Sequence, residues 1–156
     1  MFDPSEDPIP QVVYHGTDSD AGTDISRNGI NLEKCTKGYF GLGFYAACDK
    51  ALAKSNYADF AEGEEGVVLS LQIHEGAKIL DLRNEFDFKT YAELTKNGAY
   101  QFRDDFAQFM QANGIDGLYD NSFEGVVFYN PRIITVSYAQ ELSDTEILPE
   151  IARPKG

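Results

Sequence analysis

The stretch GYFGLGFY, residues 38–45, sets its glycines within a run of aromatic residues. Glycine lets a backbone bend tightly and lie close to a ligand, and aromatic rings offer flat faces for stacking. A helix is expected over residues 50–61, because Asp49 is a favourable N-cap residue directly before it. The stretch therefore predicts a pocket for a planar group rather than an ordinary core strand.

The composition of the chain bounds its class. It has 156 residues, 42% of them hydrophobic, which suits one domain with a proper core. Its formal net charge is -13, from 13 Lys and Arg residues against 26 Asp and Glu residues. So acidic a chain gains no general steering toward nucleic acid or an anionic membrane, although a local basic face stays open. The charge indicates solubility, and it would also suit a basic partner.

The cysteines and the chain start bear on the compartment. Cys35 and Cys48 are too few for a disulfide framework, which indicates a reducing environment. No basic segment followed by an apolar one opens the chain, and no apolar run is long enough to span a bilayer. We expect a cytoplasmic protein with no membrane partner, with the reservation that a specialised delivery route needs no such signal.

Three parts are expected along the chain: an N-terminal arm over residues 1–11, a folded domain over 12–138 and a polar tail over 139–156. The arm is dominated by proline and acidic residues, which disfavour a packed structure. The domain begins with a short strand over Val12–His15, which Gly16-Thr17 would close.

The pattern inside the domain alternates between strands and helices. Residues 67–74 show the strongest strand alternation. The polar segment 18–28 points Ile25 inward and is followed by Gly29, which fits a helix C′ position. Further strands are expected over residues 77–82, 115–119, 124–129 and 133–138, with a loop over 120–123. This order predicts an α+β fold, without the repeated βαβ rhythm of a parallel sheet.

Two helical patterns lie within residues 84–113. The first would stop at Asn97-Gly98 and the second at Gly114. Aromatic stripes at helical spacing belong far more often to a core than to a cofactor site, so we expect them to point inward. The expected inward residues are Phe88, Tyr91 and Leu94 in the first pattern, and Phe102, Phe106, Phe109 and Met110 in the second.

The segment GLGFYA, residues 41–46, formally matches the dinucleotide fingerprint G-x-G-x-x-G/A. That fingerprint opens a helix directly after a strand. Here Phe44 and Tyr45 follow the second glycine and favour a strand, so the helix would begin later. A Rossmann phosphate loop is therefore rejected.

Metal and thiol chemistry have little support in the sequence. The two histidines, His15 and His74, have no metal-ligand spacing to the cysteines, so no metal site is expected. Nothing near Cys48 marks it as a nucleophile, and small buried cysteines are common.

Three polar residues remain as candidates for a site: His15, Tyr45 and Glu124. His15 could be a core histidine that donates to a backbone carbonyl, and Tyr45 could be a core aromatic. Glu124 would begin an otherwise apolar strand, where a buried charge must be paired or serve a function. Taken singly, each residue is explained at least as well by a structural role.

Taken together, these residues carry a resemblance to the ADP-ribosyltransferase superfamily. The branch concerned uses a His-Tyr-Glu triad, as poly(ADP-ribose) polymerases and diphtheria-type toxins do. YHGT (residues 14–17) resembles the first motif of that branch, and FGLGFY (40–45) resembles its F-G-x-G-x-Y motif, with KSNY (54–57) at nearly the expected distance. EGVVFY (124–129) resembles the strand of the catalytic glutamate. The three motifs stand in the right order between about residues 12 and 138.

The resemblance implies a split antiparallel β-sheet with flanking helices that binds NAD as a substrate. His15 would hydrogen-bond a ribose hydroxyl of the adenosine half, and the backbone of Gly16 would grip the nicotinamide carboxamide. Tyr45 would stack on the nicotinamide ring, and Glu124 would bond the 2′-hydroxyl of the nicotinamide ribose. The implied catalytic residues are Glu124, His15 and Tyr45. The implied NAD-binding residues are His15, Gly16, Thr17, Gly43, Tyr45, Ser55 and Tyr57.

The same resemblance assigns an acceptor loop to Asn121, Ser122 and Phe123. Arginine-specific transferases carry a carboxylate two residues before the glutamate; Ser122 stands there in this chain, which disfavours arginine as the target. Phe123 would either stack on the acceptor or plug the core. The spacing from Ser55 to Tyr57 is one residue shorter than in the polymerases.

The leading hypothesis is a mono-ADP-ribosyltransferase that modifies a protein or a nucleic acid. The compact build resembles bacterial or phage-borne toxins and effectors, and it implies an antitoxin or immunity partner. An NAD glycohydrolase and an inactive binding module for ADP-ribose or a partner are the alternatives. An RNA 2′-phosphotransferase-like enzyme ranks lower, because few basic residues lie near the motifs to hold its phosphate.

Overall fold

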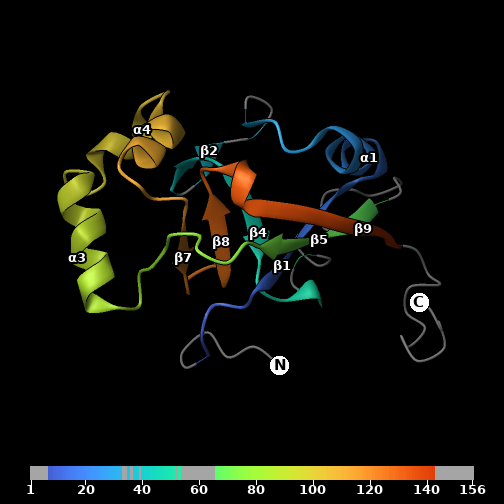
Figure 1. The fold of residues 1–156 in the computed structure, drawn as a ribbon, viewed down its shortest axis with the longest axis horizontal. Helices are drawn as coiled ribbons and strands as arrows, with labels where there is room; N and C mark the ends of the chain where they lie inside the picture. Colours follow the sequence, from blue (N-terminus) through green and yellow to red (C-terminus); the bar gives the residue numbers. More distant parts are fainter. Residues whose placement is uncertain are drawn as a thin grey trace.

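The computed structural model describes residues 7–32, 35, 37–38, 40–51, 53 and 66–142. Its centre is a seven-stranded mixed sheet with the strand order β6-β7-β8-β4-β1-β5-β9 (Figure 1). The strands are β1 (Val12–Asp18), β4 (Phe44–Ala47), β5 (Gly66–Ile73), β6 (Ile79–Asp81), β7 (Gly117–Asp120), β8 (Gly125–Phe128) and β9 (Ile134–Leu142). Neighbours pair antiparallel, except that β6 and β7 run parallel.

The remaining elements flank this sheet. A separate two-stranded sheet holds β2 (Lys37–Gly38) and β3 (Gly41–Leu42). The helices are α1 (Ser19–Asn28), α3 (Glu85–Leu94) and α4 (Phe106–Ala112), with 3₁₀ turns η2 (Ala99–Phe102) and η3 (Pro131–Ile133). Figure 1 shows α1 at the end of the sheet opposite α3 and α4. The fold is α+β, as the sequence predicts. No helix in the described ranges is long and apolar enough to cross a membrane.

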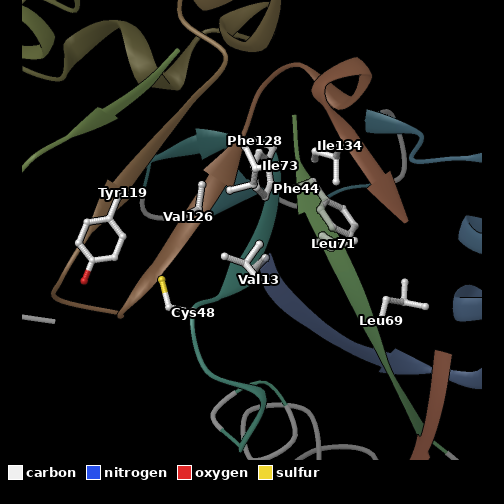
Figure 2. Packing of buried hydrophobic residues seen from close by; sticks show 11 residues of the cluster. Val13, Phe44, Cys48, Leu69, Leu71, Ile73, Tyr119, Val126, Phe128 and Ile134 are labelled. Carbon is white, nitrogen blue, oxygen red and sulfur yellow. The ribbon is translucent and has the colours of Figure 1, made fainter. Parts of the chain in front are cut away.

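The two faces of the sheet bury different hydrophobic clusters. The first cluster (Figure 2) has Val13, Phe44, Leu69, Leu71, Ile73, Val126 and Phe128 among its members. Ile25 of α1 packs against it. The second cluster joins Leu80, Leu118, Val127 and Tyr129 of the sheet region to Tyr91 of α3 and to Phe106 and Met110 of α4. Every residue of the central strand β8 is buried, so this strand is covered on both faces, which holds its backbone in one register.

Several sequence predictions are confirmed at the level of single elements. The alternating residues Val67, Leu69, Leu71 and Ile73 are all buried in β5. Gly29 has φ +86° and its N–H donates to the carbonyl of Ile25, as a residue that ends a helix does. The carboxylate of Asp49 accepts from the N–H of Ala51 at 2.8 Å, which confirms its capping role. Residues 54–61 of the expected helix lie outside the described residues.

The strand at the first motif is longer than predicted. Gly16 and Thr17 do not close it, because β1 continues through them to Asp18. Each residue of β1 pairs with β5, from Val12 opposite Gln72 to Asp18 opposite Gly66. Glycine has a low intrinsic preference for strands, and pairing with β5 along the whole of β1 overrides that preference at Gly16.

The last strands also differ from their predicted bounds. Glu124 does not begin β8, which starts at Gly125; it lies in the preceding turn with φ +53°. β9 continues through Leu142, past the boundary expected at residue 138. It does so because it pairs with β5 as far as Gly66 opposite Leu142. Residues 143–156 of the expected tail are outside the described part.

The prediction that Phe88 and Phe102 point inward is wrong. Their side chains are 55% and 75% exposed, whereas Phe106 and Met110 are fully buried. Phe102 lies in the 3₁₀ turn η2 and not in the α-helix of Phe106, so its spacing to Phe106 does not place both on one helical face. The second helix begins at Phe106 instead.

Candidate functional site

A cleft of about 250 Å³ opens between β1, β4 and α1. His15 and Thr17 line it from β1, and Gly43 and Tyr45 line it from the β4 side. These four residues were all predicted to bind NAD, and the fold places them on one wall. Small-molecule clefts usually enclose about 300–1,000 Å³, so this cleft suits one half of a dinucleotide rather than the whole.

The pairing of β1 with β4 brings the first two motifs together. Tyr14 lies opposite Ala47, which sets His15 beside the backbone of Tyr45 thirty residues further along the chain. The ring nitrogen Nδ1 of His15 is 2.7 Å from the carbonyl oxygen of Tyr45. Such an adjacency between non-consecutive strands depends on the tertiary pairing and on no local pattern.

The hydrogen bond to Tyr45 determines the chemistry of His15. A carbonyl oxygen only accepts, so Nδ1 carries the proton and Nε2 is an acceptor in the neutral ring. Burial lowers the pKa of His15, and the hydrogen bond to the Tyr45 carbonyl opposes this only in part. His15 is therefore neutral at pH 7 and offers one acceptor nitrogen. Its ring also packs on Phe44, with 4.2 Å between the ring centroids.

The side chain of Tyr45 points to the other face of the sheet. Phe44 belongs to the first cluster, whereas the Tyr45 ring packs on the second. The hydroxyl of Tyr45 donates to the carbonyl of Gly41 at 2.7 Å and accepts from the N–H of Phe40 at 2.9 Å. Burial raises the pKa of Tyr45 to about 12, although the bond from Phe40 acts in the opposite direction. The Tyr45 hydroxyl thus holds the backbone of Phe40 and Gly41 by two hydrogen bonds. Its stacking on the nicotinamide ring stays a prediction.

Gly43 lies directly before β4 and close to residues of β8. A Cβ atom added to it would lie 2.6 Å from Cγ2 of Val127 and 3.0 Å from the carbonyl oxygen of Phe128. No larger residue fits there without moving one of the strands. The glycine is followed by a strand and not by a helix, which confirms that the G-x-G spacing is not a Rossmann phosphate loop.

Glu124 lies next to the same strands but does not line the cleft. Its carbonyl accepts from the N–H of Cys48, directly after β4, at 2.9 Å. Its side chain is half-buried, and its positive φ costs a non-glycine residue about 1–2 kcal/mol. Strain of this kind gathers at functional sites, where the surroundings hold it in place.

The expected acceptor loop forms the turn between β7 and β8. Asn121 and Ser122 are exposed, and the N–H and hydroxyl of Ser122 both bond the carboxylate of Asp120. Phe123 is half-buried, with its ring centroid 5.9 Å from that of Tyr45 and 6.2 Å from that of Phe40. Of the two roles considered for Phe123, this position fits the core plug.

The other residues predicted to bind NAD are not among the residues that line the cleft. Gly16 lies in β1 between His15 and Thr17, although its own atoms are not part of the cleft lining. Ser55 and Tyr57 lie outside the described residues. The lining also includes Asp24 of α1, which sequence reasoning did not single out. It stands in a polar helical segment, where nothing distinguishes a residue over a cleft from one in solvent.

The described residues favour neither metal nor thiolate chemistry. No group of three or more His, Cys, Asp or Glu side chains within them could hold a metal ion. Burial raises the pKa of Cys48 to about 12, with a smaller contribution from the negative charge of Glu124. Cys48 is therefore a protonated thiol at neutral pH, which makes it a poor nucleophile.

A scan of the chain against protein-family models finds no match, and a search of curated proteins finds none either.

Proposed function

We propose that the protein is a mono-ADP-ribosyltransferase with an ADP-ribosyltransferase-like fold. It would cleave the nicotinamide–ribose bond of NAD and transfer ADP-ribose to a protein or a nucleic acid. The observation that supports this best is the adjacency of β8, β4 and β1 in the sheet. Glu124, Tyr45 and His15, from three separate motifs, lie on or directly before these three neighbouring strands.

The residues around the cleft would suit half of an NAD molecule. Nε2 of His15 is an acceptor for a ribose hydroxyl, because its partner nitrogen is committed to the Tyr45 carbonyl. Because Gly43 has no side chain, a ligand could approach the backbone at that wall of the cleft. The Phe44 ring lies beside His15. The backbone of Gly16 would hold the carboxamide without steric bulk. Ser55 and Tyr57 would complete the nicotinamide pocket.

The proposed reaction breaks the bond between the ribose anomeric carbon and the nicotinamide nitrogen. The bonding electrons leave with that nitrogen and neutralise the pyridinium, while positive charge develops on the sugar as in glycoside cleavage. The Glu124 carboxylate would bond the 2′-hydroxyl and stabilise that charge. A nucleophilic oxygen or nitrogen of the acceptor then bonds the anomeric carbon and loses its proton.

The test is Glu124→Gln, assayed with labelled NAD and a cell lysate fractionated into protein, RNA and DNA. We expect NAD to bind nearly as before and turnover to fall by roughly 10²–10³ or more, because the amide keeps the shape but not the charge. Glu75→Gln, which alters an exposed glutamate away from the cleft, is the matched control. Equal turnover in Glu124→Gln and wild type would contradict the proposed catalytic role of Glu124.

One observation favours a second candidate, an NAD glycohydrolase. Phe123 packs against Tyr45 and Phe40, so it is not presented to a macromolecular acceptor. Water would then take the place of the acceptor, and the same assay separates the two. Label on a macromolecule supports the transferase, free ADP-ribose alone supports the glycohydrolase, and no NAD consumption favours an inactive binding module.

A biological role as a toxin or effector is part of the proposal. The net charge of -13 would suit a basic antitoxin or immunity protein. Co-expression with a genomic neighbour that relieves toxicity would support this role.

A further inference from the structure

The backbone of the glycine stretch is bonded by the hydroxyls of two tyrosines. The hydroxyl of Tyr129 donates to the carbonyl of Phe40 at 2.8 Å, and the hydroxyl of Tyr45 accepts from the N–H of Phe40 at 2.9 Å. The Tyr45 hydroxyl also donates to the carbonyl of Gly41 at 2.7 Å. Two side chains of the main sheet region thus bond three backbone groups of two consecutive residues. We call these two side chains the tyrosine clamp.

The register of β4 and β8 places both tyrosines on one face of the sheet. Tyr45 lies opposite Val127, and Tyr129 follows Val127 by two residues, so both side chains emerge on the same side. Both rings pack in the second cluster, where Tyr129 is fully buried and lies edge-on against Phe106. Burial raises the pKa of Tyr129 well above its ordinary value, so its hydroxyl keeps its proton and remains a donor.

The clamped residues belong to a hairpin that glycine permits but does not fix. β2 and β3 pair Gly38 with Gly41, and Gly41 has φ +86°. Glycine adopts many backbone conformations at little cost, so contacts from outside the hairpin must select one. The Tyr45 ring lies against this hairpin so closely that a Cβ atom added to Gly38 would be 2.6 Å from its Cζ.

We infer that Tyr129 is a positioning residue for the cleft, which acts with the Tyr45 hydroxyl through the backbone of the glycine stretch. Only Leu42 separates the clamped residues from Gly43, which lines the cleft. The Tyr129 ring also supports Gly43 directly, because a Cβ atom added there would lie 3.4 Å from its Cδ1. The clamp therefore sets this wall before a ligand binds. The inference rests on the proposed function for the identity of the ligand, NAD, and gives the Tyr45 hydroxyl a role separate from ring stacking.

The kinetic effect of the clamp follows from preorganisation. A wall that is already ordered spares the ligand the entropic cost of ordering it. This gain applies equally to the ground state and the transition state, because the clamp hydroxyls bond the protein backbone and not the reacting atoms. Loss of the clamp should therefore raise KM and leave kcat nearly unchanged. A residue that served stability alone would change the folded fraction, which lowers the apparent kcat at constant KM.

The test measures KM and kcat for NAD cleavage in Tyr129→Phe and in Tyr45→Phe. Each substitution keeps the aromatic ring and removes only the hydroxyl. We expect KM to rise by about three- to tenfold in each variant, as is typical for one lost hydrogen bond, and kcat to stay within about twofold of wild type. If Tyr129→Phe does not fold, Tyr45→Phe carries the test, because its ring is only half-buried.

Tyr91→Phe is the matched control. It removes a hydroxyl from a buried tyrosine of the same cluster, whose bond goes to the side chain of Gln101. We expect Tyr91→Phe to lower Tm about as much as Tyr129→Phe does and to leave KM at its wild-type value. An equal rise of KM in Tyr91→Phe would overturn the inference, since general loosening of the cluster would then explain the effect.

The outcomes distinguish this inference from the proposed function. If KM is unchanged in both clamp variants while the cleavage of NAD depends on Glu124, the inference fails and the proposed function stands. If NAD is never cleaved, its affinity is measured by calorimetry instead. A three- to tenfold weaker affinity in the clamp variants alone would then support the inference while the proposed function fails. A wild-type protein that does not bind NAD would overturn both.

Discussion

At the scale of a single residue, the surroundings of His15 determine both its tautomer and its charge. Its Nδ1 proton is committed to the Tyr45 carbonyl, which leaves Nε2 as an acceptor that would suit the proposed ribose hydroxyl. Burial keeps the ring neutral, because a charged imidazole would lose its hydration without gaining a counter-ion bond. Protonation would turn the acceptor into a donor, so the proposed contact with a ribose hydroxyl requires the neutral form.

The lowered pKa of His15 predicts a loss of stability in mild acid. The unfolded chain binds the proton first, at a pKa near the ordinary value of about 6.5, so the free energy of unfolding falls as pH decreases below that value. Above it both states are neutral, and His15 contributes no pH dependence. The loss amounts to about 1.4 kcal/mol for each unit between the unfolded and folded pKa values.

Urea unfolding at about pH 7.5 and about pH 5.5 measures this effect. The decrease in the free energy of unfolding should be smaller in His15→Gln than in wild type, because glutamine does not titrate. His74→Gln is the control, since His74 is exposed and its ring Nε2 lies within hydrogen-bonding distance of the hydroxyl of Thr135. The same pH dependence in all three proteins would contradict the prediction.

At the scale of elements, the aromatic segment after β6 divides into an exposed and a buried part. Phe86 and Phe88 stand two residues apart on α3 and cannot share one helical face. Tyr91 is the buried aromatic of that helix, and its hydroxyl donates to the side chain of Gln101. α4 buries three residues in the second cluster, and its Phe106 lies edge-on against Tyr129 with 5.2 Å between ring centroids.

Two alanine substitutions test this division. Phe106→Ala should lower the free energy of unfolding by about 3–5 kcal/mol, because it removes a fully buried ring and leaves a cavity in the second cluster. Phe102→Ala, a matched change at a ring that is 75% exposed, should lower it by less than about 0.5 kcal/mol. The free energies come from urea unfolding. Similar losses in both variants would show that η2 packs more tightly than its exposure indicates.

At the scale of the whole molecule, the motif strands occupy the middle of the sheet. β8, β4 and β1 each have a strand on both sides, whereas β6 and β9 form the edges. Central strands open last in native-state fluctuations, because their hydrogen bonds and both buried faces must be lost together. The cleft thus has a rigid floor, and its opposite wall is the helix α1.

The net charge of -13 predicts a salt-dependent stability for the whole molecule. Repulsion between carboxylates destabilises the compact state, and salt screens it. Raising NaCl from about 0.02 M to about 0.3 M, which shortens the Debye length to well under 10 Å, should increase Tm. The expected rise is about 2–4 °C, equivalent to about 1 kcal/mol in a domain of this size.

Scanning calorimetry at the two salt concentrations checks this expectation. A Glu85→Gln/Glu93→Gln variant, which removes two exposed charges from α3, should show a smaller rise than wild type. A fall in Tm with salt would mean that specific ion pairs, such as Arg83 with Asp81, outweigh the general repulsion.

The sequence alone determined the features that depend on neighbouring residues. The alternation over 67–74, the capping by Asp49 and the left-handed Gly29 follow from local steric and hydrogen-bonding rules, and the structure has all three. The resemblance to the ADP-ribosyltransferases, and no local rule, pointed to the motif residues His15, Thr17, Gly43 and Tyr45, which line one cleft.

Only the tertiary structure decided which face and which partner each side chain takes. Pairing of β1 with β5 carried the first strand through Gly16, and the turn before β8 left Glu124 at φ +53° beside Cys48. The same packing turned the Tyr45 ring away from the cleft and set Asp24 over it. A local pattern cannot specify these outcomes, because each depends on a strand or helix that is distant in sequence and adjacent in space.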